Sequence, residues 1–265
     1  ENLFVKKGIK GIPSLLSSGT FAGFYGTEDK IIEGDRYRPL SLVIFAIEAE
    51  LFATPKTEIL KLGTQKGEFL DLGAETMFPH ILHFQNVLLY GFLCLLLYRT
   101  ILLLLNPLSD YHNIKSFQIA ALTSVLFAVH PVHTEAVANV KGIDEILALI
   151  FSLACLNVSF QTAIRLQESA TIEWKQLFLG FIYLFLAILS KEIAIVCLVL
   201  IPMAVFCFTK LSFRQILPVV VPLLLAVGIT TGIRIAAVGI EWKGDRLQNE
   251  LMNDPFVELN PTVKL

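Results

Sequence analysis

A short polar segment between two long apolar stretches carries the residues of this sequence that are best suited to chemistry. It runs from His130 to Glu145 and reads HPVHTEAVANVKGIDE. Imidazoles and carboxylates move protons or bind metal ions. The pattern of His130, His133 and Glu135 fits a shared metal or proton-transfer site, and it fits a hydrogen-bonded helix cap equally well.

Three carboxylates of this segment are candidate catalytic groups. Glu135 is the first candidate, and Asp144 and Glu145 come next. A carboxylate can take the proton from a hydroxyl group that attacks a substrate. The competing interpretation is that these are acids at the start of a helix, where the helix dipole favours negative charge.

Three cations elsewhere are candidate ligands for a phosphate. Lys191 is followed by Glu192 and separates two apolar runs, Arg234 lies near the end of the last apolar run, and Arg38 follows Tyr37 just before a predicted helix. Ionisable residues at the edge of a membrane span are functional candidates, and arginine can hold a phosphate with two hydrogen bonds. The alternatives are a solvated turn pair, snorkelling of Arg234 to the interface, and a solvated loop arginine.

The composition indicates that a membrane surrounds these residues. Hydrophobic residues make up 55% of the 265-residue chain and charged residues 17%, and the mean hydropathy of +0.68 exceeds that of an ordinary soluble domain. We predict an all-α, multi-pass transmembrane domain over residues 81–240, with helices that cross roughly 30 Å of hydrocarbon. The predicted spans are 81–105, 116–130, 146–164, 176–190, 193–209 and 215–240.

The cations of the short loops predict the orientation of these spans. Three loops carry two cations each, and they lie on the same side in this topology: Arg99 with Lys115, Arg165 with Lys175, and Lys210 with Arg214. The positive-inside rule places that side in the cytoplasm. The polar segment and the Lys191 turn therefore face the extracytoplasmic side, which is the periplasm or an organelle lumen.

The first 80 residues and the last 25 are predicted to lie on the same outer side. Residues 1–80 read as a long extracytoplasmic loop that carries a membrane-surface helix over 39–53, because no stretch of it could cross a bilayer. Residues 241–265 read as the start of a further outer loop. The net charge of −2 gives no electrostatic support to a nucleic-acid partner.

Five ordered motifs resemble a known family. They are DRYRPLS at 35–41, HFQNVLL at 83–89, FAVHPVHTEAVANVKG at 127–142, LSKE at 189–192 and NDPF at 253–256. Together they resemble the membrane half of the transmembrane and tetratricopeptide-repeat O-mannosyltransferases and their bacterial relatives. That family belongs to the multi-pass GT-C glycosyltransferases. Within the second motif, His83 and Asn86 lie one turn apart and are predicted to hydrogen-bond between helices.

The resemblance implies a function and its partners. We expect a membrane glycosyltransferase that moves a sugar, expected to be mannose, from a polyprenyl-phosphate donor to a hydroxyl of a protein or peptide at the extracytoplasmic face. Lys191, Arg234 and Arg38 would then hold the donor phosphate, and one of the carboxylates would act as the base. Whether a divalent metal takes part is left open by the residues.

Two departures from the family keep other interpretations in view. Ile143 stands where the family usually has an arginine, and the acidic motif that such enzymes place after their first span would lie upstream of Glu1. We therefore expect these 265 residues to be inactive alone, with any tetratricopeptide repeats beyond Leu265. A non-catalytic membrane scaffold is one alternative. A transporter is another, although it usually shows an internal repeat and helices broken at mid-membrane.

Overall fold

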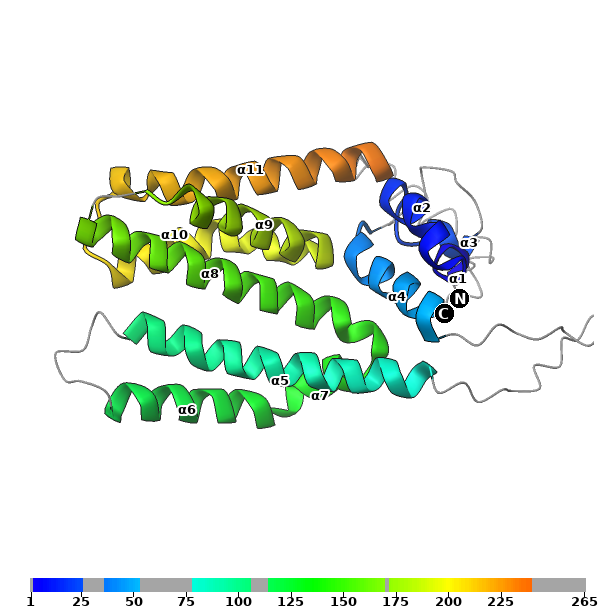
Figure 1. The fold of residues 1–265 in the computed structure, drawn as a ribbon, viewed down its shortest axis with the longest axis horizontal. Coiled ribbons are helices and arrows are strands. Elements are labelled where there is room, and N and C mark those ends of the chain that lie inside the picture. Colours follow the sequence, from blue (N-terminus) through cyan, green and yellow to red (C-terminus); the bar gives the residue numbers. More distant parts are fainter. Residues whose placement is uncertain (1, 26–35, 53–77, 106–113, 170–171, 240–265) are drawn as a thin grey trace, which may run out of the picture.

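A computed structural model describes residues 2–25, 36–52, 78–105, 114–169 and 172–239 of the chain, and every regular element among them is a helix. The long helices lie side by side in a bundle, and short helices cover one of its ends (Figure 1). The predicted all-α architecture is therefore confirmed for the described residues. The predicted loop regions 53–77 and 241–265 lie outside the description.

Six helical stretches occupy the six predicted spans. They are α5 (Phe78–Leu105), α6 (Ile114–Val129), α8 (Ile143–Ser169), α9 (Trp174–Ser190), α10 (Cys197–Phe208, which follows the 3₁₀ helix η5, Glu192–Val196) and α11 (Phe213–Val238). Helix α8 is central, since it packs against α5 on one side and α9 on the other. Helix α6 packs against α5, and α11 packs against both α9 and α10.

Three of these helices are long and apolar enough to cross a membrane. They cover His80–Leu105, Val140–Ser169 and Phe213–Val238. A fourth crossing results if α6 and the helical turns after it count as one span, although the chain bends there by 52°. The stretches Trp174–Ser190 and Glu192–Phe208 are apolar but shorter. The chain therefore has the helices of a membrane protein, and the count of six crossings stays a prediction.

Helix α8 begins earlier than the sequence pattern suggests. We expected residues 131–145 to form an outer loop and the span to begin at 146, but α8 begins at Ile143 and has Asp144 and Glu145 in its first turn. Negative charge in the first turn stabilises a helix because the unpaired backbone N–H groups give that end a partial positive charge. The start-of-helix interpretation of these two acids is confirmed.

The N-terminal residues are more ordered than a loop. The predicted helix 39–53 is present as α4 (Pro39–Phe52), and the short helices α1 (Leu3–Lys6), η1 (Gly8–Gly11), α2 (Ile12–Ser17) and α3 (Ala22–Tyr25) precede it. The apolar contacts that hold them to α4 come from four buried residues: Phe4, Leu15, Ala22 and Ala46. We call residues 2–25 and 36–52 the N-terminal cap. It lies against one end of the bundle, where α4 contacts α8 and α9 (Figure 1).

Candidate functional site

Six of the predicted site residues form three ion pairs at the end of the bundle that the cap covers. Arg38 Nη1 lies 2.7 Å from Asp144 Oδ2. Lys191 Nζ lies 2.6 Å from Glu145 Oε1. Arg234 Nε lies 3.8 Å from Glu192 Oε1. We call these six residues the ion-pair cluster.

The backbone joins the three pairs into one unit. Asp144 and Glu145 are consecutive at the start of α8, and Lys191 and Glu192 are consecutive where α9 ends. Lys191 leaves the helix in an extended conformation, with φ −153° and ψ 128°. The start of α8, the end of α9, the last turns of α11 and the residue just before α4 therefore present opposite charges to one another.

Arg38 and Asp144 are the buried pair of the cluster. Their side chains are 14% and 8% exposed, and Arg38 Nε is buried without a hydrogen-bond partner. The interpretation of Arg38 as a solvated loop arginine is therefore wrong. Arg38 links the cap to α8, and its charge is already compensated by Asp144.

The other two pairs are open to a ligand. The side chains of Lys191 and Glu145 are 22% and 54% exposed, and those of Arg234 and Glu192 are 46% and 31% exposed. A phosphate that reaches these cations competes with carboxylates that already neutralise them. Binding of such a ligand would release a carboxylate from its ion pair.

Tyr37 fastens the cap beside the cluster. Its ring is 4% exposed and packs against Ala237 and Val238 at the end of α11. Its hydroxyl donates a hydrogen bond to Leu16 O at 2.8 Å, and its backbone N–H donates to Glu192 Oε1 at 3.1 Å. Burial raises the pKa of the Tyr37 hydroxyl above its ordinary value. Tyr37 therefore holds the cap against the end of α11.

The two histidines of the polar segment lie on another part of the fold. His130 and His133 belong to a helical turn after α6, made of η3 (Pro131–His133) and α7 (Thr134–Ala138). His130 Nδ1 accepts a hydrogen bond from the Val132 N–H at 3.2 Å, which confirms the helix-cap interpretation for this residue. Together with Tyr90 of α5 they line an open cavity of about 260 Å³.

Glu135 does not join these histidines in a metal site. Its side chain is exposed and makes no hydrogen bond or ion pair with the described residues. Across the part of the chain that the structure describes, no three His, Cys, Asp or Glu side chains are grouped closely enough to hold a metal ion. The reason is local, because Glu135 occupies the first turn of a separate short helix, α7.

Two residues outside the predicted site, Asn86 and Gly142, hold the loop before α8 in place. Asn86 of α5 is 1% exposed, and its Nδ2 donates to Asn139 O at 2.9 Å. His83 and Asn86 were predicted to hydrogen-bond between helices, and Asn86 does bond to another segment, at the residue that joins α7 to η4 (Val140–Gly142). At Gly142, a Cβ atom would lie 2.1 Å from the backbone oxygen of Ala136, so only glycine fits. The sequence signal for this constraint was the glycine that ends the motif at 127–142.

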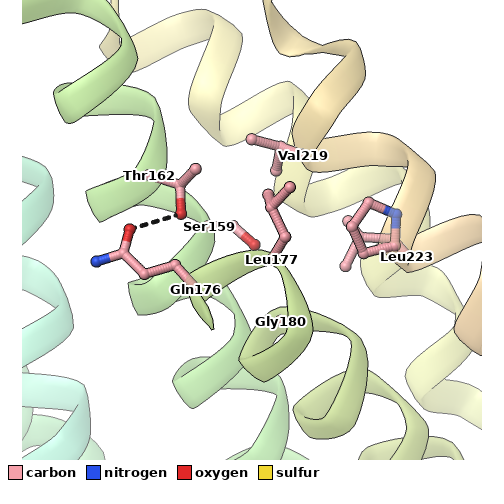
Figure 2. A pocket seen from close by; sticks show the side chains of 8 residues that line it. Ser159, Thr162, Gln176, Leu177, Gly180, Val219 and Leu223 are labelled. Carbon is pink, nitrogen blue, oxygen red and sulfur yellow. Dashed lines mark hydrogen bonds between the residues drawn. The ribbon is translucent and has the colours of Figure 1, made fainter. Parts of the chain in front are cut away.

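One cavity between helices of the bundle is very small. It lies between α8, α9 and α11, has a volume of about 10 Å³, and is lined by Ser159, Gln176 and Gly180 among others; Figure 2 shows these residues. The Thr162 hydroxyl donates to Gln176 Oε1 at 3.0 Å on its wall. A volume of this size holds at most one water molecule. This cavity cannot hold a transported solute.

Comparisons with known proteins give local similarities. A protein O-mannosyl-transferase of Caenorhabditis elegans is 62% identical over 45 residues, which are 17% of this chain and 6% of that protein. Protein O-mannosyl-transferase TMTC1 of Mus musculus is 42% identical over 82 residues, 31% of this chain and 8% of the relative. Protein O-mannosyl-transferase Tmtc3 of Drosophila melanogaster is 41% identical over 87 residues, 29% of this chain and 9% of the relative.

These matches support the resemblance over a part of the chain. The matched segments span less than a tenth of the length of these relatives. No family model matches the chain, and no solved structure does.

Proposed function

We propose that the chain is part of a membrane glycosyltransferase of the GT-C type. It transfers a sugar, mannose, from a polyprenyl-phosphate donor to a hydroxyl of a protein at the extracytoplasmic face. The observation that carries this proposal is the ion-pair cluster, which gathers accessible cations and carboxylates at one end of an apolar bundle. The local similarity to protein O-mannosyl-transferases supports the same reaction.

The place of the cluster suits a lipid-linked donor. The exposed faces of α5, α10 and α11 are apolar, with residues such as Leu95, Val199 and Leu224 facing outward. A polyprenyl tail would remain in the bilayer beside them, while its phosphate reaches the end of the bundle. Lys191 and Arg234 would then stabilise the negative charge of the departing phosphate, since fixed cations stabilise charge that develops in a transition state.

Glu145 is the base that this arrangement favours. When the donor phosphate binds Lys191, Glu145 loses its ion-pair partner and becomes free to accept a proton. The acceptor hydroxyl oxygen then forms a bond to the anomeric carbon of the sugar, and the bond between that carbon and the phosphate oxygen breaks. The hydroxyl proton passes to Glu145, and polyprenyl phosphate leaves with the bonding electrons.

A transfer assay with the intact protein tests this proposal. Labelled mannosyl-phosphoryl-polyprenol and a serine- and threonine-containing peptide would be supplied to the protein in liposomes. We expect Lys191→Ala and Glu145→Gln each to lower kcat by about 10²–10³-fold, the loss typical for removal of a charge-stabilising group. Lys191→Arg keeps the cation and should restore part of the rate. Lys175→Ala, at the other end of α8 and α9, should leave the rate unchanged.

Two outcomes would contradict the proposal at different levels. Unchanged transfer in both Lys191→Ala and Glu145→Gln would overturn the site, and a loss in Glu135→Ala would then make Glu135 of α7 the base. No transfer by the intact protein with any of several sugar donors would overturn the reaction itself.

A non-catalytic scaffold is the second candidate, and one observation favours it. Ile143 is 1% exposed at the start of α8, so the position where the resembling family has a cation is filled by a packed apolar side chain. With each cation of the cluster neutralised by a carboxylate, the cluster also serves to hold the cap on the bundle. The transfer assay separates the two candidates.

A further inference from the structure

The cavity beside the two histidines is separate from the ion-pair cluster, and the proposed reaction leaves it unused. It has a volume of about 260 Å³ and is open to the outside. Its polar wall consists of His83 and Tyr90 from α5 and His130, His133 and Thr134 from the helical turn after α6. Small-ligand pockets hold a few convergent polar groups on a mostly apolar wall, and drug-sized ligands need roughly 300–1,000 Å³. This cavity therefore suits a ligand of about one ring.

The cavity exists because the chain bends at Pro131. Proline cannot donate the backbone hydrogen bond that would continue α6, and the following turns leave its axis at 52°. The Tyr90 hydroxyl lies 3.0 Å from the carbonyl oxygen of Phe127, which also accepts the His130 N–H, and 3.2 Å from that of Ala128. The bend is thus held by a specific contact from α5, and the cavity forms in the angle.

The two imidazoles of the wall can act as neutral hydrogen-bonding groups. His130 Nδ1 accepts the Val132 N–H, so the proton of a neutral His130 ring is on Nε2, where it can be donated to a ligand. Burial, together with the neighbouring His130 ring, lowers the pKa of His133 below its ordinary value. A wall of neutral donors and acceptors suits hydroxyl groups better than an anion.

The same wall offers flat ring faces. Tyr90 and His133 both line the cavity, and their ring centroids are 5.8 Å apart with an interplanar angle of 45°. Aromatic faces bind the apolar C–H side of a saturated ring, while hydroxyl groups at its edge need hydrogen-bond partners. A pyranose has both kinds of surface.

We infer that the cavity lined by Tyr90, His130, His133 and Thr134 is a binding site for a single neutral pyranose ring, distinct from the ion-pair cluster. The inference does not rest on the proposed transfer reaction. It predicts carbohydrate binding whether or not the chain is an enzyme. Hydrogen bonds from the imidazoles and the Thr134 hydroxyl hold the ring edge, and the aromatic faces cover its C–H side.

Saturation-transfer difference NMR on the full chain in phosphatidylcholine nanodiscs tests this site. The probes are methyl α-mannopyranoside and methyl α-glucopyranoside. We expect saturation transfer to the ring protons of at least one glycoside, and a decrease of at least fivefold in Thr134→Val and in His133→Phe. Thr134 is exposed, so its isosteric replacement leaves folding intact, and His133→Phe keeps the ring packing while removing both nitrogens. His80→Leu removes an exposed histidine that does not line the cavity and should leave the signal unchanged.

Three results of these binding experiments would overturn the carbohydrate site. No saturation transfer from either glycoside overturns the inference, and so does an equal signal in Thr134→Val, His133→Phe and the parent. Preferential binding of inorganic phosphate, seen by broadening of its ³¹P line only when His133 is intact, would show an anion site and overturn it as well. Lys191→Ala should lower the rate of transfer as expected above and leave glycoside binding intact. Loss of glycoside binding in that variant would contradict a site separate from the cluster.

Discussion

Burial decides what the ion pair of Arg38 and Asp144 contributes to the protein. Removal of one member of a buried pair leaves an uncompensated charge, which typically costs about 3–5 kcal/mol. Both side chains are less than 15% exposed. The pair therefore matters most for the attachment of the cap to α8.

A double-mutant cycle measures this contribution. We expect Asp144→Leu to lower the free energy of unfolding by about 3–5 kcal/mol, because Arg38 stays buried without a counter-ion. Adding Arg38→Met should restore much of the loss, since two apolar side chains need no partner. Chemical denaturation in detergent micelles gives the free energies. Lys191→Ala is the control, because its partner is half exposed, and its cost should stay below about 1 kcal/mol. Additive losses in the double variant would contradict the coupling.

Glu48 of α4 is a second buried charge, and it lies outside the ion-pair cluster. The residue is 6% exposed, and its Oε2 atom has no hydrogen-bond partner. Burial raises the pKa of its carboxyl group to about 7, although a hydrogen bond with Gln85 opposes the shift. The folded state therefore binds the proton more tightly than the unfolded state, whose pKa is the ordinary one.

Stability should consequently decrease as the pH rises through this pKa. The contribution of protonated Glu48 is complete below about pH 4.5 and is lost through pH 7, which amounts to about 3 kcal/mol. We expect the midpoint of thermal unfolding, followed by circular dichroism, to fall between pH 5 and pH 8 in the parent. Glu48→Gln should remove most of this fall. Glu50 is exposed and lies two residues further along α4, so Glu50→Gln should keep the fall of the midpoint. Identical pH profiles of the two variants would contradict the assignment of this fall to Glu48.

At the scale of elements, the loop between α7 and α8 sets where the cluster acids lie. Gly142 packs against the backbone of Ala136 and directly precedes the first residue of α8. We expect Gly142→Ala to lower the free energy of unfolding by about 1–3 kcal/mol, as is typical for overpacking.

The matched controls are glycines in the middle of helices with open space around them. Gly91 in α5 and Gly228 in α11 have no atom within 4 Å of an added Cβ. Alanine at either position should raise stability by about 0.5–1 kcal/mol through its better helix propensity. The same denaturation experiment compares the three variants. A stable Gly142→Ala variant would show that the loop can adjust.

The sequence predicted the elements better than it predicted the contacts between them. Long apolar stretches predict long helices because their side chains have few other environments. The short helices of the cap that precede α4 escaped prediction, since four to six residues form a stable helix only when tertiary packing supports them. The order of the predicted spans placed the cluster residues on the same side of the membrane. Their pairing did not, because Arg38 and Asp144 are 106 positions apart and only the folded cap brings them together.

In the pattern of His130, His133 and Glu135, residues that are close in sequence do not form a common site. Close spacing in sequence suggested a common site, but His133 ends η3, whereas Glu135 lies in the first turn of α7 with its side chain exposed. Sequence spacing predicts proximity only along one regular element. Here two short helices, η3 and α7, divide the motif.

At the scale of the whole molecule, helix α8 relates the cluster to the bilayer. The helix has 27 residues and is about 40 Å long at 1.5 Å per residue, so its ends can reach both surfaces of a membrane. Lys141 precedes its first turn on the side of the ion-pair cluster, and Lys175 follows the connection at its other end. Both side chains are exposed. The distribution of loop cations predicts that the Lys175 end is cytoplasmic.

Cysteine labelling in sealed, right-side-out vesicles tests this topology. Cys207 is exposed and would be replaced by serine, and the variant without a further change gives the background. We expect Lys141→Cys to react with a membrane-impermeant maleimide in intact vesicles. Lys175→Cys should react only after detergent opens them, because its thiol faces the vesicle interior. Equal labelling of both positions before permeabilisation would contradict a span between them. The reverse pattern would place the ion-pair cluster, and with it the proposed transfer reaction, on the cytoplasmic face.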